Sequence, residues 1–404
     1  MPDPARPVPP PPPVSLLTGG RDSPYAFGLA MALVAAHCRL DFIGSDEVNP
    51  AQLAGADRLR FFNLRGDQRI NVALGRKIWR VLAYYARLIR YAATARPRIF
   101  HILWVNKFEW FDQTVLMLYF KCLGKKICFT AHNINREQRD GRDSRLNRLT
   151  LKIHYRLCDH IFVHTEAMKA ELIAGFQQPG TKITVIPFGL NNVLPVTTLT
   201  GAEARARLGL AAAHKVILFF GNIAPYKGLE FLIAAFERVA AADPACRLVI
   251  AGRPKGDPDY WVRIQASIRH SPVRDRILQV IEYVSDAQTE WYFKAADVSV
   301  LPYVHVFQSG VLSLSYSFGL PVLAADVGSL REDILVGQTG LVFPPGNPGE
   351  LARRLQEYFA SDLYQNLGRF RAAIREYAAE KYSWTKVAAR TTAVYAQLSG
   401  GDQP

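Results

Sequence analysis

The sequence predicts an α/β protein built from two similar halves, and two observations lead to this prediction. Short apolar strands alternate with helical segments along nearly the whole chain, a pattern typical of parallel sheets covered by helices. A Thr-, Ala- and Gly-rich passage at residues 194–202 separates two such series of similar length. The 404 residues, 49% of them hydrophobic, are enough for two or three domains with large cores.

In the first half, residues 1–13 are proline-rich and we expect a disordered tail there. Apolar runs then predict strands at 14–18, 39–47, 98–104, 125–132, 160–165 and 182–189. Helices are predicted between them at 23–38, 110–124 and 149–158. These elements make up a domain expected over residues 14–192.

In the second half, strands are predicted at 215–222, 246–252, 276–284, 296–303, 321–326 and 339–345, with a helix at 229–242. This second domain is expected over residues 193–378. A C-terminal helix at 379–399 is expected to return to the first domain. Since ligands of such sheets bind beyond the carboxyl ends of the strands, the functional residues are expected directly after each strand.

Charge and cysteine content narrow the class of protein. The net charge is +14, and residues 1–200 carry 27 basic and 15 acidic side chains, a surplus of +12, which leaves +2 for the remainder. Such an excess points to an anionic partner for the first half. The five cysteines include no C-x-x-C pair, so neither a disulfide framework nor a zinc site is indicated, and we expect a cytoplasmic location.

One uncharged stretch has the length of a membrane span. Residues 298–325 contain no Asp, Glu, Lys or Arg, which would suffice for a transmembrane helix. However, the stretch contains two prolines, two glycines and several polar residues, and its pattern breaks into strand, loop, short helix and strand. We therefore interpret it as buried α/β core.

Several strand ends carry residues that suit a phosphate or a sugar. Gly19 and Gly20 follow the first strand, where glycines allow close approach of a phosphate but equally form ordinary turns. His132 follows the strand at 125–132 and either holds a hydroxyl group or is an ordinary loop histidine. Lys227 and Arg253 follow two strands of the second half and are either anion ligands or solvated surface residues.

The most informative segment follows the strand at 296–303. Its loop carries Gln308, Ser309 and Gly310 and leads into an apolar helix. Small residues at 309 and 310 would let a diphosphate rest on the free backbone N–H groups at the start of that helix. No acidic side chain lies nearby in the sequence to repel it.

Together these elements resemble the retaining glycosyltransferases of family four (group 1). The resemblance covers residues 14–398 and is most specific in FFGNIAPYKGLEFLIAAF, AADVSVLPY and FGLPVLAADVGSLREDILVGQTGLVFPPGNPGELARRL. It implies the GT-B fold, with two Rossmann-like domains facing across a cleft. It also implies a nucleotide-sugar donor bound by the C-terminal domain, an acceptor bound by the N-terminal domain, and no metal or other cofactor.

The resemblance also implies roles for single residues. Lys227 and His132 match the catalytic positions, the lysine on the donor diphosphate and the histidine near the transferred sugar. Further diphosphate-binding positions are Gly19, Gly20, Asn222, Arg253, Ser309, Gly310 and Val311. Glu282, Tyr283, Gln308 and Glu332 are expected to contact the nucleotide or sugar.

The sequence departs from the family pattern at two places. Asn222 stands where the family usually has arginine, and Arg253 could supply that charge. Val306 and Leu314 stand where the usual glutamate pair is expected, which indicates a divergent branch. Because retaining transfer depends on stabilising the leaving diphosphate, loss of the carboxylates need not abolish the chemistry.

The expected function is metal-independent transfer of a hexose-type sugar to a glycan or lipid-linked acceptor, in cell-surface or exopolysaccharide synthesis. The alternatives are a catalytically weak nucleotide-sugar-binding protein or partner subunit, and another enzyme of the same fold. Nucleic acid is not an expected partner, since no nucleic-acid-binding pattern accompanies the charge. Residues 74–98 carry seven basic and no acidic side chains. They indicate either a peripheral helix for an anionic surface at the inner face of the membrane or a core helix with solvated arginines.

Overall fold

The computed structural model describes residues 10–19, 23–48, 53, 56–69, 72–106, 108–135, 137, 143–189 and 197–400. Residues 1–9 of the expected tail lie outside this described part, as does Gly20. The chain divides into two compact units. Unit 1 comprises Met1–Gly189 with Ser383–Pro404, and unit 2 comprises Leu190–Tyr382. Both are parallel α/β units, which confirms the predicted fold class.

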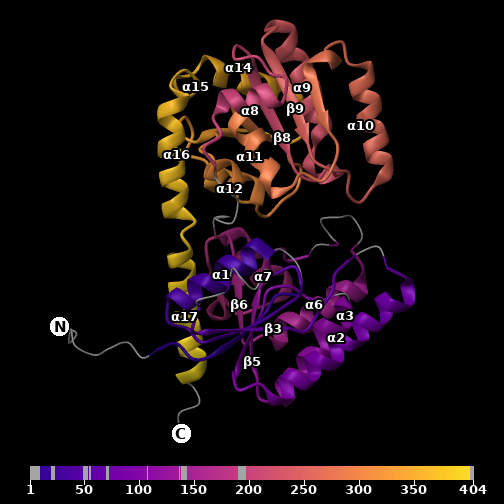
Figure 1. Cartoon of the computed structure of the whole chain (residues 1–404), viewed down its shortest axis with the longest axis vertical. Helices are drawn as coiled ribbons and strands as arrows, with labels where there is room; N and C mark the ends of the chain where they lie inside the picture. Colours follow the sequence, from indigo (N-terminus) through magenta and orange to yellow (C-terminus); the bar gives the residue numbers. More distant parts are fainter. Residues whose placement is uncertain are drawn as a thin grey trace, which may run out of the picture. The chain divides into compact units, whose positions relative to one another are not determined.

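Unit 1 contains a seven-stranded parallel sheet in the order β3-β2-β1-β4-β5-β6-β7 (Figure 1). Its strands are β1 (Val14–Leu17), β2 (Leu40–Gly44), β3 (Leu59–Asn63), β4 (Ile99–Ile102), β5 (Lys126–Thr130), β6 (His160–Val163) and β7 (Ile183–Val185). The order turns outward from β1 in both directions, as in a doubly wound sheet. The carboxyl ends of β1, β4, β5 and β6 are therefore neighbours along one edge.

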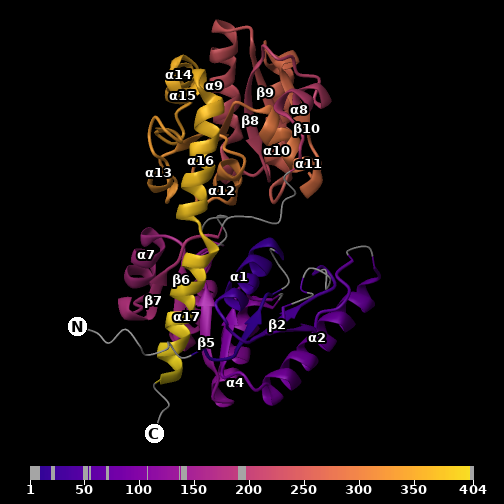
Figure 2. The same ribbon diagram turned by 60° about the vertical axis from the view of Figure 1, so that its left-hand side comes forward.

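The helices of unit 1 lie on both faces of this sheet. They are α1 (Ser23–Ala35), α2 (Leu74–Thr94), α3 (Glu109–Phe111), the π-helical η2 (Asp112–Leu116), α4 (Met117–Cys122), α6 (Arg145–Leu157), α7 (Glu166–Phe176), the short η3 (Gly180–Lys182) and α17 (Trp384–Gly400). Figure 2 shows the C-terminal α17 running beside the sheet. There its buried Tyr395 hydroxyl lies 2.5 Å from Nδ1 of His101 on β4.

Unit 2 contains a six-stranded parallel sheet in the order β10-β9-β8-β11-β12-β13. Its strands are β8 (Lys215–Phe220), β9 (Cys246–Ala251), β10 (Ile277–Val280), β11 (Val298–Leu301), β12 (Val322–Ala325) and β13 (Gly340–Phe343). Its longer helices are α8 (Gly201–Arg207), α9 (Leu229–Ala242), α10 (Pro258–His270), α11 (Asp286–Ala295), α12 (Gly310–Ser317), α14 (Pro348–Ala360) and α16 (Leu367–Lys381). Shorter ones are η4 (Pro225–Lys227), η5 (Arg274–Arg276), α13 (Leu330–Asp333) and α15 (Asp362–Gln365).

The uncharged stretch at 298–325 is part of the unit 2 core. It forms β11, a loop, α12 and β12, and both strands are fully buried. The interpretation of this stretch as α/β core is thus confirmed. Among the described residues, no helix is both long and apolar enough to cross a membrane.

Candidate active site

Lys227 is the central cation at the strand ends of unit 2. It ends the short helix η4 after β8, and its side chain is buried, with 7% of the residue exposed. Its Nζ donates to the Tyr303 hydroxyl at 2.5 Å and lies 3.8 Å from the centroid of the same ring. The tyrosine therefore holds the ammonium group by a hydrogen bond and by the face of its ring, which fixes the position of a buried charge.

Tyr303 connects this lysine to the start of α12. Its hydroxyl lies 3.3 Å from the Ser309 hydroxyl, and Ser309 is the buried N-cap residue of the helix. The Ser309 side chain makes no capping hydrogen bond, and the first backbone bonds inside the helix begin at the amide of Leu312. The amides of Gly310 and Val311 precede those bonds. Lys227 and a helix N-terminus thus meet through one tyrosine, an arrangement suited to an anion.

The loops that carry these groups are locked together by close backbone contacts. The amide of Val304 donates to the carbonyl of Tyr226 at 3.0 Å. Gly228 has φ +63°, and a Cβ there would lie 2.1 Å from the carbonyl oxygen of Pro302. Only glycine fits at that position. The glycine of the K-G pair after β8 is therefore needed for this approach of the β11 loop.

Arg253 lies at the neighbouring strand end, but it is exposed. Its guanidinium lies 5.4 Å from the centroid of the exposed Tyr283 ring, after β10. Asn222, half-buried, is in the loop that pairs with the Arg253 loop, since the amide of Ile223 donates to the Arg253 carbonyl at 2.9 Å. The structure thus brings Asn222, Arg253 and Tyr283 to adjacent strand ends, with Glu282 exposed beside them.

The remaining predicted donor residues are more scattered. Gln308 is half-buried just before Ser309, and Glu332 is exposed on α13, where its backbone carbonyl accepts from Lys381 Nζ at 2.7 Å. Val306 is buried in one apolar cluster of unit 2, and the half-buried Leu314 packs against a different one, so hydrophobic packing occupies both positions of the usual glutamate pair.

In unit 1, His132 follows β5 and is enclosed by aromatic rings. Its imidazole stacks on Trp104, with centroids 4.3 Å apart and an interplanar angle of 6°, and meets the edge of Tyr25 at 4.7 Å. Burial, reinforced by nearby His164 and His101, holds the pKa of His132 well below its usual value. The ring is therefore neutral at physiological pH.

The hydrogen bonds of His164 assign the tautomer of His132. Nδ1 of His164 lies 3.3 Å from the Ile186 carbonyl oxygen, which can only accept, so Nδ1 carries the proton. In this neutral imidazole, whose pKa burial lowers to about 4, Nε2 must accept. Nδ1–H of His132 donates to it at 3.1 Å. Nε2 of His132 is then a lone-pair acceptor, and it has no hydrogen-bond partner among the described residues.

Gly19 supports this histidine through Trp104. It has φ +62°, and a Cβ there would lie 2.4 Å from the Trp104 carbonyl oxygen. The strand ends of β1 and β4 can approach only because residue 19 is glycine. The close approach to Trp104 thus explains the glycine at position 19. Gly20 lies outside the described residues, so its predicted role stays a prediction.

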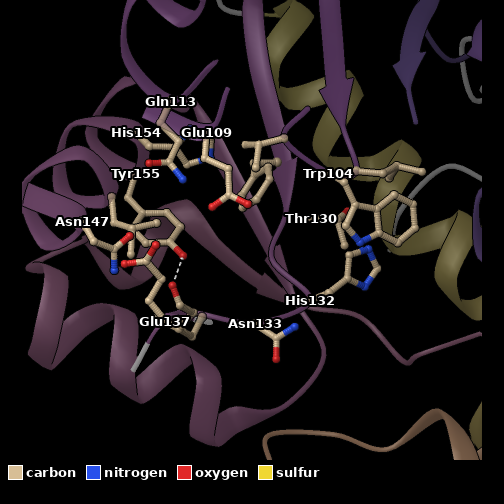
Figure 3. Close-up of a pocket in the computed structure, with 15 residues that line it drawn as sticks. Trp104, Glu109, Gln113, Thr130, His132, Asn133, Glu137, Asn147, His154 and Tyr155 are labelled. Carbon is tan, nitrogen blue, oxygen red and sulfur yellow. Dashed lines mark hydrogen bonds between the residues drawn. The ribbon is translucent and has the colours of Figure 1, made fainter. Parts of the chain in front are cut away.

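A pocket of about 100 Å³ opens beside His132 (Figure 3). Polar side chains from three segments face it: Glu109 and Gln113 from the α3–η2 segment, Asn133 and Glu137 from the loop after β5, and Asn147 and His154 from α6. His154 is 1% exposed and neither ring nitrogen has a hydrogen-bond partner among the described residues. Carboxylates, amides and a neutral imidazole are groups that bind hydroxyls.

Sequence reasoning missed the residues that hold the two central groups. Tyr303 was read only as the end of a strand, and Trp104 and His164 were not singled out. A position directly after a parallel strand was the one signal that all three shared. In the described part of the chain, no group of three or more His, Cys, Asp or Glu side chains has the arrangement of a metal site.

Two family profiles match the two units separately. The profile described as Glycosyltransferase Family 4 matches residues 23–192, and the profile described as Glycosyl transferases group 1 matches residues 214–361. A D-inositol 3-phosphate glycosyltransferase from Streptomyces bingchenggensis is 30% identical over 252 residues, 60% of this chain. An uncharacterized glycosyltransferase from Methanocaldococcus jannaschii is 31% identical over 60% of this chain. The chain spans 54% and 60% of these two relatives' lengths, respectively.

Solved structures agree on the fold. Sucrose-phosphate synthase from Thermosynechococcus elongatus aligns with a TM-score of 0.74 and 20% identity, covering 97% of this chain and 100% of that one. Anabaena HepE in complex with UDP and glucose aligns with a TM-score of 0.72 and 17% identity, covering 96% and 100%. The fold is therefore GT-B, and with both units matched by profiles, the chain belongs to the group 1 glycosyltransferases of family four.

Proposed function

We propose that the chain is a retaining glycosyltransferase that moves a hexose-type sugar from a nucleotide-sugar donor to a hydroxyl-rich acceptor. The observation that carries this proposal is the Lys227–Tyr303–Ser309 constellation, in which Tyr303 connects a buried ammonium group to the N-terminus of α12. Charge stabilisation of this kind is what a leaving diphosphate requires. The complexes of HepE with UDP and with UDP-glucose support a donor of this class.

In the proposed step, the acceptor hydroxyl oxygen bonds to the anomeric carbon on the face from which the diphosphate departs. The bond between that carbon and the phosphate oxygen breaks, and the hydroxyl proton passes to the diphosphate. Lys227, Arg253 and the amides of Gly310 and Val311 stabilise the negative charge that develops on the leaving group. Glu282, Tyr283, Gln308 and Glu332 are proposed to contact the nucleotide or sugar.

His132 is proposed to orient a sugar hydroxyl. Its Nε2 is the acceptor left by the hydrogen-bond chain from the Ile186 carbonyl, so a hydroxyl group would donate to it. The pocket beside it, with Glu109, Asn133 and Asn147 on its wall, is proposed to bind acceptor hydroxyls. The relative that acts on D-inositol 3-phosphate supports a polyhydroxylated acceptor.

We further propose that the enzyme works at the cytoplasmic face of a membrane in glycan or exopolysaccharide synthesis. The basic α2 and the free state of all five cysteines support this location. The charge supplied by Lys227 and the helix amides replaces that of a metal in the proposed step. Rates measured with EDTA should therefore equal those without it, and a loss restored by a divalent cation would contradict this part.

The test is incubation of the protein with a panel of nucleotide sugars and polyol acceptors. Acceptor-dependent release of nucleoside diphosphate is expected, and NMR of the product should show the anomeric configuration of the donor. Inverted product would refute the retaining mechanism. Tight binding of a nucleotide sugar without any turnover would instead favour a binding protein or partner subunit.

A further inference from the structure

Exposed apolar side chains are concentrated on one part of unit 1. Of the seventeen large apolar side chains that are exposed among the described residues, eleven lie between residues 74 and 149. We call these eleven the docking surface: Leu74, Ile78, Trp79, Leu82, Ile89, Phe108, Trp110, Val115, Leu118, Leu146 and Leu149. Trp79 and Trp110 are 70% and 62% exposed. A concentration of this kind on an otherwise polar surface marks an interaction site.

The helices that carry the docking surface, which are α2, the α3–α4 segment and α6, contact one another. Along α2, Leu74, Ile78 and Leu82 are four residues apart and share one face, which Tyr85 and Ile89 continue. Tyr85 stacks on Phe108 with centroids 5.8 Å apart, and the Tyr119 hydroxyl of α4 donates to the Ile89 carbonyl at 3.0 Å. The α6 helix packs directly against η2 and α4.

The buried residues of α2 explain why its first turns are uncovered. They are Tyr84, Tyr85, Leu88, Tyr91 and Ala92, all in the second half of the helix. The first half therefore extends beyond the core of unit 1. The apolar side chains of this first half are therefore exposed to solvent. Burial of these side chains against an apolar partner would be favourable.

A small basic pocket lies against the same half of α2. This pocket of about 50 Å³ is lined by Arg65, Lys77 and Arg80, and no carboxylate of the described residues lines it. The Arg80 guanidinium lies 3.7 Å from a carboxylate oxygen of Asp67, and the Arg65 guanidinium donates to the Gly19 carbonyl. Lys77 also lines the pocket, and its ammonium group, unlike those two guanidinium groups, makes no hydrogen bond or ion pair with the described residues. Three converging cations favour a bound anion, and a phosphate group has the matching charge.

We propose that the docking surface binds an anionic phospholipid bilayer, with a lipid phosphate in the basic pocket. Trp79, Trp110 and the leucines would enter the headgroup boundary, and the cations of α2 would meet the negative surface. The positive charge of α2 favours an anionic bilayer over a second copy of the chain as the partner. Pairing two copies through α2, which has no acidic residue, would bring like charges together.

The same helices relate this surface to the proposed acceptor pocket. On α3, Glu109 lines the pocket while Trp110 is exposed, and on α6, Asn147 lines it while Leu146 is exposed. Resting on the proposed function, this arrangement favours a lipid-linked acceptor whose polar head enters the pocket from the bilayer. The membrane binding itself does not depend on that function.

The test is co-sedimentation of the full chain with vesicles of phosphatidylcholine alone or mixed with phosphatidylglycerol. Binding to the anionic vesicles is expected, weaker at high salt, with little binding to the neutral ones. The variants Ile78→Gln/Trp79→Gln/Leu82→Gln and Leu146→Gln/Leu149→Gln should each lower the partition coefficient at least about tenfold, since each removes buried apolar area. Lys77→Gln should lower it at low salt only.

The matched control is Val262→Gln/Val336→Gln, which removes two exposed apolar side chains of unit 2 and should bind as the parent does. Donor hydrolysis, measured without vesicles, should be unchanged in every variant, so failure of membrane binding and failure of the proposed function are distinguishable. Equal binding by the α2 variant and the parent would overturn the proposal. So would a parent dimer that the variant dissociates, or a Lys77-dependent thermal shift with inorganic phosphate but no vesicle binding.

Discussion

Units 1 and 2 share one architecture but place different chemistry at their strand ends. At its strand ends unit 2 has the buried Lys227, held by Tyr303 beside the start of α12. Unit 1 instead has His132 and His164 after its strands. They are two of five histidines in this unit with lowered pKa values, the others being His101, His154 and His160. Unit 1 also carries most of the large apolar side chains that are exposed among the described residues. The comparison shows that a parallel sheet fixes where a site lies, while the side chains after each strand decide whether it suits an anion or a hydroxyl group.

The largest effect is expected from Lys227→Met. This change keeps the packing against Tyr303 but removes the charge proposed to stabilise the diphosphate, so turnover should fall about 10²–10³-fold. Steady-state release of nucleoside diphosphate measures it. The control is Lys215→Met, at the opposite end of β8, where the lysine pairs with Asp243 at 2.8 Å. If the Lys227 variant is folded and fully active, the lysine is not a donor ligand.

His132→Ala should lower kcat/KM about 10²-fold through loss of the Nε2 acceptor. Because the pKa of His132 lies well below its usual value, the parent should show no loss of activity through protonation of this ring between pH 8 and 6. A pH–rate profile checks both points. If the pH–rate profile of the parent shows a limb with an apparent pKa near 6.5, and His132→Ala lacks that limb, then the His132 imidazole is not held neutral.

His164→Phe should have a smaller effect, about tenfold on kcat with the donor KM unchanged. Phenylalanine keeps the ring contacts with Tyr25 and Phe188 but cannot accept from Nδ1–H of His132. His164→Gln, whose amide oxygen can accept, should restore part of the rate. ¹⁵N NMR of the histidine rings reports the tautomer directly, and an unchanged His132 signal in the Phe variant would refute the positioning role.

Acid should destabilise unit 1 more than unit 2. Burial lowers the pKa of His101 and of His154 to about 3, and those of His160 and His164 to about 4. Above about pH 6.5 these histidines are mostly neutral in both the folded and the unfolded chain, so they do not make the free energy of unfolding depend on pH. As pH falls from about 6.5 to 4, the unfolded chain takes up protons that the folded unit excludes, and stability falls by up to about 1.4 kcal/mol per histidine per pH unit.

Hydrogen exchange at pH 7 and pH 5 measures this difference for each unit. Protection in β4, β5 and β6 of unit 1 should fall at the lower pH by more than protection in β8, β9 and β11. An equal loss in the two units would contradict the assignment of acid sensitivity to the buried histidines.

Much of the fold could be predicted because parallel strands buried on both faces appear in the sequence as short apolar runs between helices. The strand β3 was not predicted, since its LRFFN sequence is only half-buried at the sheet edge. The helix expected within residues 74–98 ends at Thr94, because Ala95 is already extended. The sequence left open whether its apolar face packs inward, and the structure shows that only the second half does so.

For the site, position after a strand identified Lys227 and His132, but their partners are distant in the sequence. Tyr303 is 76 residues from Lys227, and His164 is 32 residues from His132. Such pairs depend on which strands are neighbours in the sheet, and the sequence pattern did not specify that order. For the same reason the contact between Gly19 and Trp104 could not be predicted, although both follow strands.

Unit 2 is proposed to bind the diphosphate of a nucleotide sugar at Lys227 and the start of α12. Isothermal titration calorimetry with UDP and other nucleoside diphosphates, on the parent and on Lys227→Met, tests it most directly. We expect at least one nucleoside diphosphate to bind the parent and to bind the variant about tenfold or more weakly, since a charged hydrogen bond is lost. Equal affinity in the two proteins, or no binding by the parent, would contradict it.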